Sequence, residues 1–178
     1  MKVLLSFLIF FNAYCSNQVP LKKGQHPIKG KVVRVKDGDT VVVLDEKSKE
    51  HTIRVSSIDC PERGQPFSKK AKEFVIDEIA GKEILVWVRN KDRYKREVGE
   101  IHYDPTGKSC DTEYKSLAKE LLKKGLAWHY KYYSKNEELS RLEQEAKENK
   151  VGLWSEKNPT PPWEYRKQKR EGNKTKNK

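Results

Sequence analysis

The sequence contains no apolar stretch long enough to cross a membrane as a helix. Its longest mostly apolar run, Val3–Phe11, is far shorter than the ~20 residues that a spanning helix needs. No internal repeat is present, so 178 residues suit one domain with a modest core and appendages. Histidine is also scarce. Neither His102 nor His129 has neighbours at metal-ligand spacing, and we treat both as structural.

Cysteine is equally sparse, with residues at positions 15, 60 and 110 only. A small exported protein can pair such residues as a disulfide, so Cys60 and Cys110 are candidates for a bond. Both are equally well explained as small buried hydrophobic side chains. Their spacing does not decide between the two.

The first residues indicate export. Met1-Lys2 supplies a positive start, Val3–Phe11 an apolar run, and residues 12–17 a small and polar exit, which is the pattern of a signal peptide. A buried first helix is the alternative, but no polar residues alternate along the run to give it an outer face. We therefore assign residues 1–16 to a signal peptide.

Two outcomes of export remain open at Cys15. Ala13-Tyr14-Cys15 resembles an A-x-A-like cleavage site, which predicts simple secretion. Cys15 also resembles the lipid-modified cysteine of a bacterial lipoprotein, although Tyr14 is bulkier than the small residue usual there. We favour secretion.

The charge of the chain is strongly one-sided. Lysine and arginine outnumber the acidic residues, giving a formal net charge of +12 and a pI near 9.5, and 36% of residues are charged. Such a protein is attracted to polyanions: nucleic acid, anionic membrane or acidic polysaccharide. A highly soluble surface without an anionic partner explains the composition equally well, so charge alone does not identify a partner.

Hydrophobic patterning predicts five strands. Two β-branched runs joined through an Asp-Gly turn form a strong hairpin signal, and the third run alternates apolar and polar residues. The predicted strands cover residues 31–35, 40–44, 51–55, 84–88 and 98–103.

Three segments have helical periodicity, at residues 66–80, 113–124 and 137–149. Five antiparallel strands with an intervening helix are typical of an OB-fold. We therefore predict an α+β protein: a five-stranded Greek-key barrel with about three helices. The predicted boundaries are a lead-in at 17–28, the folded domain at 29–156, and a basic tail at 157–178 that we expect to be disordered.

Four polar segments are candidates for chemistry: Asp37–Thr40 at the hairpin tip, Arg54, Asp59–Glu62, and the loop Asp92–Arg96. Each alone has an ordinary structural explanation as a turn, a helix start or a solvated strand residue. Together they provide carboxylates for a hard cation and guanidiniums that grip phosphate oxygens bidentately. A further carboxylate can orient or deprotonate an attacking water.

The succession of these motifs resembles the staphylococcal nuclease family. The order is DGDTV, an arginine on the next strand, D-x-PE, D-x-Y-x-R, KKGLAW and GLW, and it covers roughly residues 30–155. Two positions depart from the family pattern: Cys60 replaces a common threonine, and Lys95 replaces the usual glycine. The resemblance implies a calcium-dependent nuclease that cleaves DNA and RNA and leaves 3′-phosphates.

The resemblance also implies roles for individual residues. Asp39 and Asp59, with the Cys60 carbonyl, would bind Ca²⁺, and Asp37 would support that pocket. Arg54 and Arg96 would hold the scissile phosphate, and Glu62 would direct the water. The residues expected to contact the rest of the substrate are Arg93, Tyr94, Tyr130 and Tyr132.

We expect the substrate to be single-stranded DNA or RNA in preference to duplex, because aromatic and basic side chains are interleaved at residues 128–133. Core packing explains Trp128 equally well. A monomer is expected. The main alternative function is a non-catalytic OB-fold nucleic-acid binder, which predicts gaps in the site that this sequence does not have. An adhesin or lipoprotein that functions through its charge would leave the ordered carboxylates and arginines unexplained.

Overall fold

The computed structural model describes residues 27–106 and 114–176, with side chains as far as residue 172. The predicted signal peptide (1–16), most of the lead-in (17–28) and Cys110 lie outside these residues. Cys60 carries a buried free thiol, which agrees with the alternative of a small buried hydrophobic side chain. The disulfide alternative involves Cys110 and is not tested by the described residues. No helix in the described part of the chain is both long enough and apolar enough to cross a membrane.

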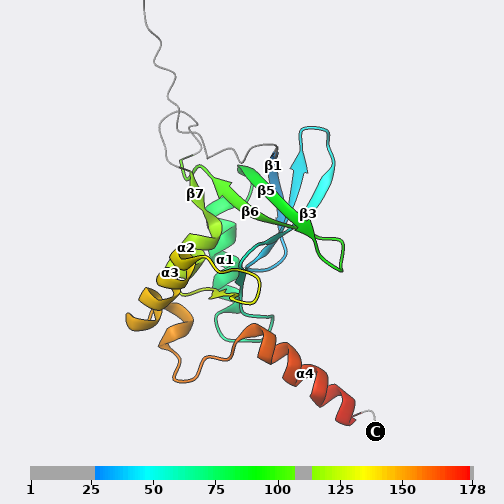
Figure 1. The fold of residues 1–178 in the computed structure, drawn as a ribbon. Helices are drawn as coiled ribbons and strands as arrows, with labels where there is room; N and C mark the ends of the chain where they lie inside the picture. Colours follow the sequence, from blue (N-terminus) through cyan, green and yellow to red (C-terminus); the bar gives the residue numbers. More distant parts are fainter. Residues whose placement is uncertain (1–26, 107–113, 177–178) are drawn as a thin grey trace, which may run out of the picture.

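Five strands close into a barrel, which confirms the predicted α+β fold with a five-stranded barrel (Figure 1). Neighbours around it follow the order β3-β2-β1-β5-β6, and β6 returns to pair with β3. The strands are β1 (Ile28–Val35), β2 (Thr40–Asp45), β3 (Glu50–Val55), β5 (Glu83–Lys91) and β6 (Glu97–Tyr103).

The pairing that closes the barrel is parallel, unlike the other four. Ile53 lies opposite Glu97 and Arg54 opposite Val98. The expectation of antiparallel strands throughout was therefore wrong at one seam. Closing an odd number of strands into a ring forces at least one pair to run in the same direction, and the seam between β3 and β6 is that pair.

Short strands and helices cover the barrel. The helix expected at 113–124 begins only at Leu117, because Lys115 and Ser116 pair with Tyr103 and His102 as a short strand. The remaining elements are β4 (Ile58–Asp59), α1 (Ser68–Ile79), β7 (Lys115–Ser116), α2 (Leu117–Lys123), β8 (Trp128–His129), α3 (Glu137–Glu148), the 3-10 turn η1 (Gly152–Ser155) and α4 (Pro162–Lys176).

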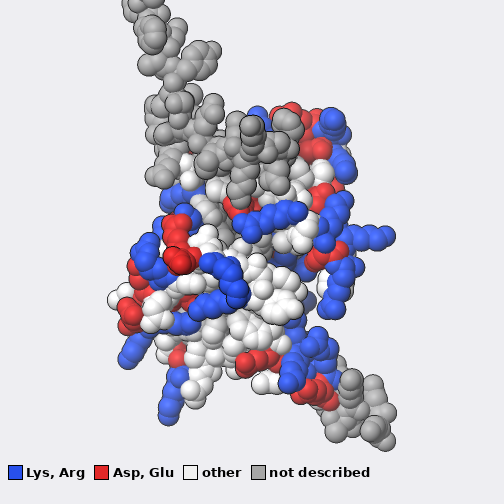
Figure 2. All heavy atoms as spheres, viewed as in Figure 1, with Lys and Arg blue, Asp and Glu red and all other residues white. Residues whose placement is uncertain are grey.

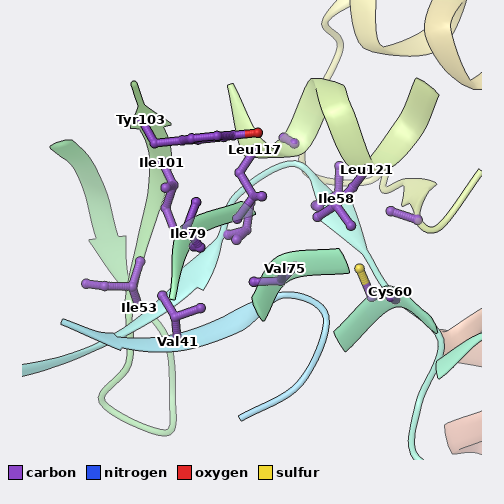
Figure 3. Packing of buried hydrophobic residues seen from close by; sticks show 14 of the residues in the cluster. Val41, Ile53, Ile58, Cys60, Val75, Ile79, Ile101, Tyr103, Leu117 and Leu121 are labelled. Carbon is purple, nitrogen blue, oxygen red and sulfur yellow. The ribbon is translucent and has the colours of Figure 1, made fainter. Parts of the chain in front are cut away.

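One core joins the barrel interior to α1 and α2 (Figure 3). Barrel side chains such as Val41 and Ile53 are fully buried and lie in the same cluster as Val75 of α1 and Leu121 of α2. Alternate side chains of the strands and the apolar stripes of the helices therefore pack in one interior. A one-residue shift of a strand would turn its buried side chains outward, so this packing fixes the strand register.

The C-terminal segment forms a helix, and the expectation of a disordered tail was wrong for residues 162–176. Proline at the first helical position is pre-organised for a helix start, and Pro162 occupies it. Trp163 and Tyr165 supply apolar surface that a disordered tail usually lacks. Figure 1 shows α4 in red, leaving the body of the molecule with its C-terminal end pointing outward.

The basic charge is distributed and does not form a single patch on the face in view. Figure 2 shows Lys and Arg side chains interleaved with Asp and Glu over that face. Surface charge mixed in this way favours solubility and general attraction to polyanions, and it does not by itself mark a binding site.

The tip of the β1–β2 hairpin packs tightly against α1 at Gly38. A Cβ atom at Gly38 would lie 2.9 Å from the Cβ atoms of both Cys60 and Ala71. Two non-bonded carbon atoms do not approach this closely, so a side chain at this position would push the hairpin away from the helix. Gly38 thereby holds the turn that carries Asp37 and Asp39 against the core.

We expect Gly38→Ala to lower the free energy of unfolding by about 1–3 kcal/mol, the usual cost of overpacking. Urea denaturation followed by circular dichroism measures this. Gly172→Ala is the matched control, because nothing lies within 4 Å of a Cβ atom at that position in α4. That control should be neutral or stabilising by up to about 1 kcal/mol. Equal stability of Gly38→Ala and the parent would contradict the packing described.

Candidate active site

The hairpin turn between β1 and β2 presents two carboxylates. The backbone N–H of Asp39 donates to Oδ1 of Asp37 at 3.1 Å, an Asx-type contact within the Asp-Gly-Asp turn. The carbonyl of Asp39 accepts from the N–H of Val55 at 2.8 Å. The turn is therefore fixed both to itself and to the end of β3.

Arg54 lies between two buried carboxylates. Its Nη1 is 2.7 Å from Oδ2 of Asp39, and its Nη2 is 2.6 Å from Oδ1 of Asp59. The register of β2 and β3 sets this arrangement by placing Thr40 opposite Arg54. The sequence prediction that these three residues converge is consistent with the structure. Burial lowers the pKa of Arg54, but the charges of Asp39 and Asp59 outweigh it and raise that pKa overall.

Cys60 contributes its backbone to the site and its thiol to the core. Its N–H donates to Oδ2 of Asp39 at 2.8 Å, while the side chain is buried in the apolar cluster. Burial first, and then the nearby Asp39 charge, hold the pKa of the thiol well above its usual value. The thiol is therefore neutral, and only backbone atoms of Cys60 remain available to a cation.

Crowding of negative charge is evident at Asp37. Desolvation by its neighbours, followed by the charge of Asp39, raises the pKa of Asp37 to about 6, although Asp37 is exposed at the surface of the turn. Burial likewise raises the pKa of Asp59, although Arg166 and Arg54 oppose the shift. Both shifts come first from desolvation of the carboxylates, and the charge of Asp39 adds repulsion at each.

Glu62 stands at the rim of this cluster. Its N–H donates to Oε1 of Gln65 at 2.8 Å, which fixes the backbone of the loop after β4. Its carboxylate accepts from Nη1 of Arg166 at 2.5 Å. Glu62, the predicted base, thus lies beside the Asp59 and Arg54 pair, and Arg166 of the C-terminal helix holds its carboxylate.

Arg96 reaches the site from the β5–β6 loop, which is built around Asp92. The Oδ1 atom of Asp92 accepts from the N–H groups of Tyr94 and Arg96, and its Oδ2 accepts from Nε of Arg96 at 2.7 Å. Lys95 has φ +62°, a left-handed conformation that glycine adopts without cost, which explains why glycine suits this position. Lysine does not displace Arg96, whose Nη1 lies 3.4 Å from Oγ1 of Thr40.

The predicted substrate-contacting residues differ in accessibility. Tyr94 and Tyr132 are 65% and 80% exposed, and Arg93 lies over the Tyr94 ring at 4.8 Å. Tyr130 instead stacks on Trp163, with ring centroids 5.1 Å apart and 3° between the planes. One face of Tyr130 is therefore already covered, whereas Tyr94, Tyr132 and the neighbouring Tyr133 (70%) are largely exposed.

Sequence reasoning missed three residues of this region: Gln65, Trp163 and Arg166. Arg166 bonds both Asp59 and Glu62, and Gln65 donates to the carbonyl of Thr160 at 2.8 Å. The signal that could have found the helix was Pro161-Pro162 followed by Trp163 and Tyr165, since proline starts helices and aromatics need burial.

Comparison with known proteins places this chain in a family. The family model described as staphylococcal nuclease homologue matches residues 52–156. The chain is 37% identical over 142 residues to an uncharacterized endonuclease of Escherichia coli O157:H7, covering 80% of this chain and 87% of that protein. It is 33% identical over 140 residues to a micrococcal nuclease of Shigella flexneri, covering 78% and 80%.

A longer plant protein is also similar. The chain is 43% identical over 126 residues to the staphylococcal-like nuclease CAN1 of Arabidopsis thaliana, which covers 71% of this chain but 36% of the plant protein. The chain thus spans about a third of the length of that relative. The family model nevertheless matches more than half of this chain, and the chain belongs to the family of staphylococcal nuclease homologues.

Proposed function

We propose that this protein is a calcium-dependent nuclease that hydrolyses phosphodiester bonds of DNA and RNA and leaves 3′-phosphates. The observation that carries the proposal is the meeting of Asp39, Arg54 and Asp59 at hydrogen-bonding distance. Family membership supports the nuclease activity in general. The metal and the position of the cut rest on the resemblance of the motifs.

The donors present fit a hard cation such as Ca²⁺. Asp39 and Asp59 both contact Arg54, and so they belong to one cluster. Among residues 27–106 and 114–172, no group of three or more His, Cys, Asp or Glu is arranged to hold a metal ion. Calcium accepts carboxylate, carbonyl and water oxygens, so Asp39 and Asp59 would be its carboxylate ligands and carbonyl and water oxygens would supply the others.

The arginines provide the grip on phosphate. Bound Ca²⁺ would supply Lewis-acid stabilisation of negative charge on the phosphate. Arg54 comes from β3 and Arg96 from the β5–β6 loop, so two planar guanidiniums can hold equatorial oxygens from separate sides. Glu62, at the rim, would orient and deprotonate an attacking water.

We also propose that the protein acts outside the cytoplasm as a secreted or periplasmic monomer, because residues 1–16 have the pattern of a signal peptide. Single strands should be preferred to duplex, since Tyr94 and Tyr132 expose faces on which separated bases can stack.

The metal assignment is tested with Asp39→Asn and Asp59→Asn, which keep side-chain volume in a buried site. Each is expected to weaken calcium binding by roughly 10–100-fold or more, as measured by titration calorimetry. Asp77→Ala, an exposed position on α1, is the control and should bind normally. A chelator should abolish turnover but leave the circular dichroism spectrum unchanged, because the barrel has its own core. Unchanged calcium affinity in both Asn variants would refute the ligand assignment.

Arg54→Lys and Arg96→Lys test the phosphate grip. Each keeps the charge but loses the planar fork, so turnover on single-stranded DNA should fall by roughly 10²–10³. Arg34→Lys, on the exposed edge of β1, should be as active as the parent, because Arg34 pairs only with Glu50 among the described contacts. Circular dichroism should show all three variants folded. Near-normal turnover in both site variants would favour the non-catalytic nucleic-acid binder.

Tyr94→Ala and Tyr132→Ala test the aromatic surfaces. Each should weaken binding of single-stranded DNA by about 1–3 kcal/mol, the contribution of stacking one base on an aromatic side chain. Fluorescence anisotropy in chelator measures binding without cleavage.

Affinity should also fall steeply with salt, because bound phosphates release counterions. Faster cleavage of duplex than of single strands at matched ionic strength would contradict the stacking role.

A further inference from the structure

The start of α4 and the residues just before it (160–166) are fixed to the candidate site at three positions. Trp163 stacks on Tyr130 and meets Trp128 edge-to-face at 5.7 Å. The carbonyl of Thr160, just before the helix, accepts from Gln65 at 2.8 Å. Arg166, one turn further along, reaches the carboxylates. The far end of α4 points away from the body in Figure 1, so the attachment is made at the start of the helix.

Arg166 binds Asp59 with both of its terminal nitrogens. Nη2 lies 2.7 Å from Oδ2 of Asp59 and Nη1 lies 3.3 Å from Oδ1, while Nη1 also donates to Oε1 of Glu62 at 2.5 Å. One guanidinium therefore bridges two carboxylates. The side chain of Arg166 is about one third exposed (36%), whereas that of Asp59 is 1% exposed. The bridge extends from the surface into the interior.

Glu62 depends on this bridge for its orientation. In the described contacts its carboxylate has Arg166 as its partner, and its own backbone is held by Gln65. Gln65 simultaneously donates to Thr160, so one side chain joins the Glu62 loop to the segment that precedes α4. Residues 160–166 thus fix both the backbone and the carboxylate of the residue assigned as base.

Arg166 leaves room for a cation at Asp59. An ionised carboxylate offers about four lone-pair positions. Arg54 and the weaker contact from Arg166 converge on Oδ1, and the shorter bond from Arg166 takes one side of Oδ2. Three of the four positions are thus taken by arginine nitrogens, and one on Oδ2 is left that a hard cation would use.

We propose that Arg166 is a positioning residue of the nuclease site: it holds Glu62 and Asp59 in place, and residues 160–166 complete a site that the barrel alone leaves open. This inference rests on the proposed function. It adds to the site a segment that lies C-terminal to residues 52–156, the part that the family model matches. Because Arg166 bonds the Glu62 carboxylate directly, we expect it to act through Glu62.

The test is a double-mutant cycle on the full chain with Glu62→Gln and Arg166→Ala. Arg166→Ala should lower kcat on single-stranded DNA by roughly 10–100-fold, as loss of an orienting partner usually does, and leave KM nearly unchanged. In the Glu62→Gln background the same change should cost less than about threefold, because coupled residues are not additive. Arg166→Lys should restore part of the rate. Added guanidinium ion should restore part of the rate to Arg166→Ala and none to Glu62→Gln.

Arg170→Ala is the matched control, since Arg170 lies one turn further along α4 and is exposed. It removes the same charge from the same helix and should leave kcat unchanged. If Arg166→Ala and Arg170→Ala lowered kcat equally, the loss would come from the overall charge of the helix, and the inference would be overturned.

The remaining outcomes separate this inference from the proposed function. If Glu62→Gln keeps normal turnover, the catalytic assignment itself is wrong. If Glu62→Gln is impaired and Arg166→Ala is normal, only the role of Arg166 is wrong. If Arg166→Ala is faster than the parent and binds calcium more tightly by calorimetry, Arg166 blocks the cation and the positioning role is overturned.

Discussion

The site depends on one buried ion cluster, in which Arg54 lies between Asp39 and Asp59. Two carboxylates this close and this poorly hydrated would repel each other strongly without a cation between them. The hairpin turn, the end of β3 and β4 each contribute one member of the cluster. The barrel positions these segments near one another, and the ion pairs of the cluster hold them together.

Much of this arrangement was predictable from sequence, because the information is local. The Asp-Gly turn fixed the hairpin, and alternation on the third strand placed Arg54 on the side away from Ile53 and Val55. Those short-range rules place the turn and Arg54, whereas a joint role for Arg54, Asp39 and Asp59 was expected from the resemblance of the motif order to the family. The role of Arg96 was expected from the same resemblance, and the structure adds that Asp92 organises its loop through contacts within four residues.

The features that sequence reasoning missed are long-range. The parallel seam depends on how five strands close, which no single strand encodes. The short strand at Lys115–Ser116 is specified by its partner β6 and not by its own residues, so helical periodicity was extended too far. The start of α4 is stabilised by Tyr130 and Asp59, both distant in sequence. A basic composition therefore suggested disorder where tertiary contacts produce a helix.

The parallel seam between β3 and β6 has a consequence for how the chain folds. Ile53 meets Glu97 only after α1 and β5, which lie between them in sequence, have been traversed. The entropy of closing that loop opposes the pairing until the intervening elements have packed, and topologies rich in such distant pairings fold slowly. Arg54 lies on this seam opposite Val98, but its carboxylate partners Asp39 and Asp59 are near it in sequence and need no closed ring. Arg96 directly precedes β6, so its contact with Thr40 forms only when the ring of strands closes.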